Sequence, residues 1–112
     1  MSDPVVAVNM FRLRPGIAAD RFARFSATVD QPTLSSYPDV VSQFQAYRVA
    51  EANGDVGLAV DIVEIMQVSD WPAWERLRDH DPALRPVTTG FDQLVDPSSV
   101  RSSLVLPILR GR

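Results

Sequence analysis

The stretch that decides the fold is "GLAVDIVEIMQVSDWPAWERLRDH", residues 57–80. Its first twelve residues, 57–68, are rich in apolar and β-branched side chains and predict a strand. Ser69 is the expected N-cap of a helix that runs from Asp70 to about His80. The third strand and the second helix of the predicted fold therefore follow each other directly.

Strand-like and helical patterns extend on both sides of this stretch. The predicted elements are strands over 4–13, 40–50 and 102–109, and helices over 18–29 and about 87–95. Pro32 is expected to end the first helix, and the Asn-Gly pair within 51–55 predicts a hairpin turn. The order β-α-β-β-α-β predicts an α+β ferredoxin-like sandwich, with helices on one face of an antiparallel sheet. Since the other face would lie open, we expect a homodimer in which a second copy covers it.

Composition excludes several classes of chemistry. The 112 residues fit one domain, and the chain has no cysteine and no lysine, which excludes thiol and Schiff-base catalysis. A net charge of -3 argues against a nucleic-acid partner, because phosphate binding needs clustered positive charge. We find no glycine-rich phosphate loop, signal peptide or membrane-spanning apolar run, and we expect a cytoplasmic protein.

Alternation along the predicted strands sorts their side chains into two faces. One face of the third strand carries Leu58, Val60, Ile62, Glu64, Met66 and Val68. We expect the more uniformly apolar faces to meet the helices, including Val6, Val8 and Met10 of the first strand. The mixed faces should meet the partner subunit or solvent, and they carry Asn9, Gln43, Gln45, Tyr47 and Asp61.

Glu64 is the one carboxylate in the apolar, helix-facing row. Burial of an unpaired carboxylate is costly, so its pKa should rise or it should find a partner. Such a perturbed group is a candidate general base. A structural ion pair with Arg12 or Arg48 is an equally open interpretation.

His80 is the only histidine in the chain and lies between Asp79 and Asp81. Successive helical residues project about 100° apart, so these three cannot converge on one metal ion, and we expect no metal site. A stripe at helical spacing consists of Ala73, Leu77, His80 and Leu84. It predicts that His80 points toward the sheet, where it could meet Glu64 in one cavity as a second catalytic group. A histidine bonded to a nearby carbonyl or aspartate is the competing interpretation.

Aromatic and polar side chains supply candidates for substrate binding. Trp71 and Trp74 would form the core or the wall of a pocket. Tyr37, Arg48 and Asn9 are weaker candidates for holding substrate oxygens. For tyrosine the competing interpretation is a satisfied buried hydroxyl, and for Asn9 it is a place at the dimer interface.

Four segments of the chain, taken in order, resemble a known protein family. They are "FRLRPG" (11–16), "DQPTLSSYPDVVSQFQAYRV" (30–49), "VEIMQVSDWPAW" (63–74) and "FDQLVDP" (91–97). In order and spacing they resemble the RedY/HapK-like family of dimeric α/β-barrel proteins. Members of this family occur in bacterial gene clusters for antibiotics and other natural products of the prodigiosin and indole types. Relatives include cyclases that close carbazole-type rings without a redox cofactor.

The resemblance implies a two-subunit barrel, no cofactor, and a small, aromatic, poorly water-soluble substrate. It places Glu64 in the family's Val-Glu strand motif, and Asp30 and Pro32 in its Asp-x-Pro loop. We therefore expect a cofactor-independent cyclase that acts on an aromatic, carbonyl-bearing intermediate by general acid–base catalysis. The alternatives are a cofactor-independent monooxygenase, a muconolactone-type isomerase, and a non-catalytic protein that binds an unstable intermediate.

Overall fold

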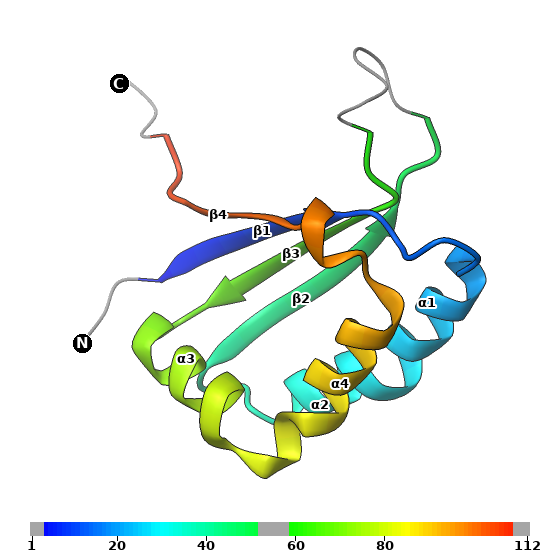
Figure 1. The fold of residues 1–112 in the computed structure, drawn as a ribbon. Helices are drawn as coiled ribbons and strands as arrows, with labels where there is room; N and C mark the ends of the chain where they lie inside the picture. Colours follow the sequence, from blue (N-terminus) through cyan, green and yellow to red (C-terminus); the bar gives the residue numbers. More distant parts are fainter. Residues whose placement is uncertain (1–3, 52–58, 109–112) are drawn as a thin grey trace.

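Strand β3 lies inside a four-stranded antiparallel sheet whose order is β2-β3-β1-β4 (Figure 1). The computed structural model describes residues 4–51 and 59–108. The strands are β1 (Val5–Phe11), β2 (Val41–Arg48), β3 (Ile62–Val68) and β4 (Arg101–Val105). The main helices are α1 (Ala19–Phe25), α2 (Gln31–Ser35), α3 (Trp71–His80) and α4 (Arg85–Leu94). The shorter helical turns are η1 (Ser26–Asp30), η3 (Pro82–Leu84) and η4 (Pro97–Ser99).

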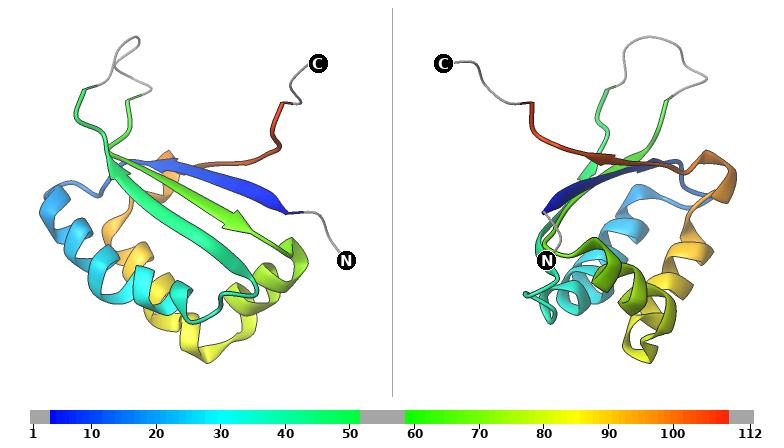
Figure 2. Two further views of the ribbon diagram at one scale, coloured as in Figure 1. Left: turned by 180° about the vertical axis from the view of Figure 1, so that it is seen from behind. Right: turned by 90° about the vertical axis from the view of Figure 1, so that its left-hand side faces the viewer.

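This arrangement confirms the predicted ferredoxin-like α+β fold. All helices cover one face of the sheet, and the opposite face carries no element of this chain within the described residues (Figure 2). β4 is an edge strand, as expected of the segment that precedes Pro107. The predicted Asn-Gly turn and the start of the predicted third strand fall within 52–58, outside the described residues.

The first helix runs further than Pro32 was expected to allow. α1 widens into the π-helical turn η1, and α2 then continues to Ser35 with Pro32 in its first turn. Proline cannot donate a backbone N–H, but the first turn of a helix does not require that donor. The π turn changes the rotation of the chain just before the proline, and it leaves Asp30 buried.

The apolar core lies between the helices and the sheet in two clusters. One cluster gathers around strand β3 and η3, and consists of Ala7, Leu34, Val41, Met66, Val68, Trp74 and Leu84. The other gathers around β1 and α1, and consists of Phe11, Leu13, Phe22, Ile62, Leu94 and Val95. Between them on β3 lies Glu64, so a polar position separates two apolar halves of the same layer.

Strand register confirms two of the three predicted face assignments and corrects the third. Ile62, Glu64, Met66 and Val68 all face the helices and are buried, as predicted for β3. On β1 the prediction is wrong, because Ala7 and Phe11 are buried while Met10 is 37% exposed. Both alternating sets of β1 are apolar apart from Asn9, so alternation alone could not choose between them. The register decides, since Asn9 pairs with Glu64 and therefore shares its face.

Two local features also differ from the prediction. The N-cap of α3 is Asp70, whose carboxylate accepts a hydrogen bond from the Ala73 N–H at 3.2 Å, and not Ser69. In β2 the register shifts between Val41 and Gln43, so Val41 is buried although strict alternation would place it on the same outward face as Gln43 and Gln45.

Candidate active site

Two carboxyl groups and an amide meet in a cavity of about 190 Å³ between the sheet and the helices. Glu64 comes from β3, Asp30 from the last residue of η1, and Asn9 from β1. Both acidic residues are only 4% exposed. The register of β1 and β3 places Asn9 beside Glu64, and the π turn places Asp30 over the sheet at the same point.

Burial raises the pKa of both carboxyl groups. The pKa of Glu64 rises from 4.5 to about 8, first through desolvation and then through the charge and hydrogen bonding of Asp30. The Asn9 side chain opposes this shift by donating a hydrogen bond to the carboxylate. The pKa of Asp30 rises from 3.8 to about 6 through desolvation, and hydrogen bonding with Glu64 limits the rise. Near neutral pH the pair therefore holds one proton and one negative charge.

The hydrogen bonds around Glu64 are incomplete. Its Oε2 atom is buried and has no hydrogen-bond partner among the described residues. Asn9 is held from the other side, because its Oδ1 accepts a hydrogen bond of 2.7 Å from the Ser102 hydroxyl. That contact leaves the Asn9 amide N–H groups free for Glu64. One carboxyl oxygen in the cavity thus lacks a donor, which an incoming ligand could supply.

The two arginines that could have neutralised Glu64 are engaged elsewhere. Arg12 lies 3.8 Å from Asp96, and Arg48 lies 3.7 Å from Asp20. The predicted alternative of a structural ion pair for Glu64 is therefore wrong for the described residues. Arg48 lies at the end of β2, beside a different pocket, so the structure does not bring this predicted substrate-binding residue to Glu64.

Apolar and aromatic side chains form most of the cavity wall. Around the carboxyl pair these are Leu34, Phe44, Met66, Trp74, Leu84, Val87 and Phe91. A neighbouring cavity of about 290 Å³ extends toward β4 and shares Asn9, Met66, Trp74, Arg78 and Phe91 with the first. Trp74 is thus a wall of both cavities, and Trp71 lines the second. The predicted role of the two tryptophans in a pocket wall agrees with these positions.

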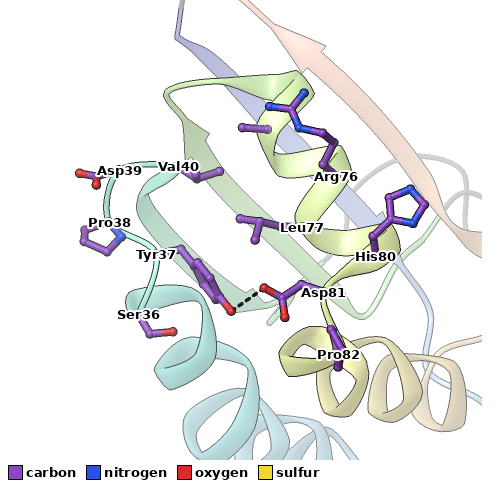
Figure 3. A pocket seen from close by; sticks show the side chains of 11 residues that line it. Ser36, Tyr37, Pro38, Asp39, Val40, Arg76, Leu77, His80, Asp81 and Pro82 are labelled. Atoms are coloured by element: carbon purple, nitrogen blue, oxygen red, sulfur yellow. Dashed lines mark hydrogen bonds between the residues drawn. The ribbon is translucent and has the colours of Figure 1, made fainter.

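His80 and Tyr37 lie together in a separate surface cleft of about 710 Å³ (Figure 3). The Tyr37 hydroxyl donates a hydrogen bond of 3.2 Å to Asp81, and His80 points away from that contact at the exposed end of α3. The expectation that His80 and Glu64 share a cavity is wrong. The inward side of α3 carries Trp74, which is 8% exposed, because its large apolar surface gains more from burial than an imidazole does.

Asp30 is the site residue that the spacing analysis missed. It follows Phe22 and Ser26 at intervals of four residues, and all three are buried on one side of the first helix. The spacing is visible in the sequence, but a helix that ends before Pro32 leaves Asp30 at the start of a loop. Only the Asp-x-Pro resemblance pointed to it.

Within the described residues there is neither a metal-binding cluster nor a membrane-spanning helix. Residues 4–51 and 59–108 contain no group of three histidine, cysteine, aspartate or glutamate side chains that could hold a metal ion. In the same part of the chain, no helix combines the length and hydrophobicity needed to cross a lipid bilayer.

The fold and the site define a small ferredoxin-like α+β protein with a buried carboxyl pair in an apolar cavity. Residues 5–105 match the family model described as REDY-like protein HapK. The chain belongs to this REDY-like HapK family. A comparison with curated proteins gave no match.

Several solved structures share the fold. HapK from Hahella chejuensis is 18% identical, with a TM-score of 0.70 over 96% of this chain and 98% of that one. SnoaB from Streptomyces nogalater, a cofactor-independent oxygenase, is 18% identical, with a TM-score of 0.73 over 97% of both chains. A dimeric ferredoxin-like protein of unknown function from Thermobifida fusca is 10% identical, with a TM-score of 0.69 over 91% of this chain and 89% of that one.

Proposed function

We propose that this protein is a cofactor-independent cyclase of bacterial natural-product biosynthesis. Its substrate is a small aromatic molecule, of indole or carbazole type, that carries carbonyl groups. The observation that carries the proposal is the buried, incompletely bonded Glu64 carboxyl in a cavity with apolar walls. A carboxyl group whose pKa is raised toward neutrality transfers protons near physiological pH, which is what ring closure next to a carbonyl requires.

The cavity walls support the choice of substrate. Aromatic side chains from β2, α3 and α4 surround the carboxyl pair and favour a flat, uncharged molecule over a charged one. The same walls would hold a flexible side chain folded against its own ring, so that the two reacting carbons stay close. The family supports the biosynthetic setting, since its model matches nearly the whole chain.

A cofactor-independent oxygenase is the second candidate, and the similarity to the SnoaB fold favours it. In that case the same proton transfer would create a carbanion that reacts with oxygen. Turnover of an aryl-substituted 1,5-diketone, which closes by aldol condensation, separates the two. A cyclase works at the same rate under air and under nitrogen, whereas an oxygenase consumes oxygen and stops under nitrogen.

The substitution Glu64→Gln tests the proposal directly. We expect ring closure of this diketone to slow by at least about 100-fold, because the amide keeps the shape of the side chain but cannot exchange a carboxyl proton. Product formation is measured by chromatography, and circular dichroism verifies that the variant is folded. Asp39→Asn changes an exposed carboxylate outside the cavity and should leave the rate unchanged. A wild-type rate in Glu64→Gln would contradict the proposal. If the wild-type protein binds the diketone tightly but releases it unchanged, it is a binding protein instead.

We also propose that the protein is a homodimer whose subunits meet through the open face of the sheet. That face exposes apolar side chains on three strands, among them Met10 at 37%, Ile65 at 36% and Val105 at 40%. Apolar surface of this kind on a sheet indicates a protein contact, and the fold is shared with a protein described as dimeric.

We expect Ile65→Asp to convert the dimer to a monomer, because it places a charge in the middle of the apolar contact. Size-exclusion chromatography with light scattering measures the mass. Gln93→Asp adds the same charge at an exposed position on α4, away from the sheet, and should leave the dimer intact. A wild-type protein that stays monomeric at micromolar concentration would exclude the proposed dimer.

A further inference from the structure

A second acidic residue, at the end of the first helix, lines the same cavity as Glu64. Asp30 is the last residue of the π turn η1 and is 4% exposed, and its side chain makes no capping hydrogen bond to the helix that follows. No salt bridge of Asp30 or Glu64 exists within the described residues. A charged group is rarely buried without a counter-ion, so this placement requires an explanation beyond packing.

The two acids can only coexist in this space when they share a proton. Asp30 and Glu64 line the same cavity and both are 4% exposed, and two negative charges side by side in so buried a place are unfavourable unless one carboxyl group is protonated. Glu64 lies between two apolar clusters, with Asn9 as its other polar neighbour, and its Oε2 has no hydrogen-bond partner in residues 4–51 and 59–108. The Glu64 site is therefore the poorer place for the negative charge. Asp30 is the better one, because the Glu64 hydroxyl can donate to it.

We propose that Asp30 is the base of this site and that Glu64, protonated in the resting protein, is the acid. This inference rests on the proposed ring-closing function. It adds Asp30 as a catalytic residue, and it makes Glu64 the proton donor where a lone buried glutamate would be the base. Asn9 then acts as a positioning residue, since Ser102 fixes its side chain and the strand register places it beside Glu64.

The resulting reaction balances within the pair. Asp30 removes a proton from the carbon next to one substrate carbonyl, and the electron pair of that C–H bond forms an enolate. The enolate carbon attacks a second carbonyl carbon of the same molecule, which makes the new C–C bond and pushes electrons onto that oxygen. Glu64 protonates this oxygen. Asp30 now holds the proton and Glu64 the charge, and transfer across their contact restores the resting pair without an oxidant or reductant.

Two other charged side chains face this cavity and bear on its pH dependence. Arg78 of α3 lines it, but its guanidinium is bonded to Asp79 at 2.9 Å and lies 3.9 Å from Glu75. Asp92 of α4 also lines it and is exposed. Neither is among the groups that shift the pKa of Asp30 or Glu64. The charged groups that determine the proton equilibrium of the site are therefore Asp30 and Glu64 themselves.

The test separates proton removal from ring closure. The probe for proton removal is 2-tetralone, a neutral aromatic ketone, whose exchange of α-hydrogen for deuterium in D₂O is followed by proton NMR. With full-length protein we expect Asp30→Asn to lose exchange by at least about 100-fold. Glu64→Gln should keep exchange within about tenfold while it loses closure of the 1,5-diketone, because the base remains and the acid is gone.

Each outcome has a distinct meaning. Absence of exchange and of ring closure in the wild-type protein overturns the proposed function itself. If exchange survives in Asp30→Asn but is lost in Glu64→Gln, the proposed function stands and the assignment of Asp30 as base is overturned. If exchange is lost equally in both variants, the division into one base and one acid is overturned. A second measurement needs no variant: in protein labelled with ¹³C at its carboxyl groups, Glu64 should be protonated at pH 7 and Asp30 ionised. The reverse would also overturn the inference.

Discussion

Replacing Phe11 with alanine is expected to lower the free energy of unfolding by about 3–5 kcal/mol, enough to unfold much of the chain at 37 °C. Phe11 is fully buried at the end of β1. Its ring packs edge-on against Phe22 at 5.5 Å and against Phe91 at 5.0 Å between ring centres. One side chain thus joins the sheet to both the first helix and α4, and its removal leaves a cavity that three elements border.

Urea denaturation followed by tryptophan fluorescence measures this loss, at one fixed protein concentration because dimerisation contributes to stability. Phe11→Leu is the matched control: it keeps most of the apolar volume and should cost only about 1 kcal/mol. A loss below about 1 kcal/mol in Phe11→Ala would show that this cluster does not hold the two layers together.

The fold was predictable because its strands are visible in the sequence as apolar, β-branched runs. The long apolar, β-branched run that becomes β3 and the helix that follows it leave few alternatives, and the order of elements then selects the ferredoxin-like arrangement. The path after Asp30 does not follow from the same rules, because Pro32 predicts the end of a helix whereas α2 continues to Ser35. The π turn depends on tertiary packing, because it is stabilised by the contacts of its buried residues and not by local helix propensity.

The candidate site was half predictable for the same reason. Glu64 stood out as a lone acid in an apolar strand row, which is a strictly local pattern. The stripe that contains His80 predicts the wrong inward side of α3, because the neighbouring stripe that contains Trp74 fits helical spacing equally well and buries more apolar surface. Asn9 and Asp30 could only be placed by pairing between elements, through strand register and through the first helix.

Stability should fall as the pH rises from about 5 to 8, which is opposite to the behaviour of carboxylates held in ion pairs. The pKa of Glu64 is about 8 in the folded protein and 4.5 as a reference for the unfolded chain, and that of Asp30 is about 6 against 3.8. Between these values the folded state binds more protons than the unfolded state, so each rise in pH favours unfolding. The stabilising contribution is complete below about pH 4 and is lost as Glu64 ionises in the folded protein.

Glu64→Gln should remove most of this slope and make the protein more stable than wild type at pH 8. The amide stays neutral at every pH, and its N–H₂ group can donate to the Asp30 carboxylate, so no second charge forms in the cavity. We expect a difference on the order of 3 kcal/mol at pH 8 that shrinks to near zero at pH 5. Thermal unfolding of both proteins at half-unit pH steps measures it. Parallel curves for the two proteins would mean that Glu64 ionises normally in the folded state, and the carboxyl pair would then lose its physical basis.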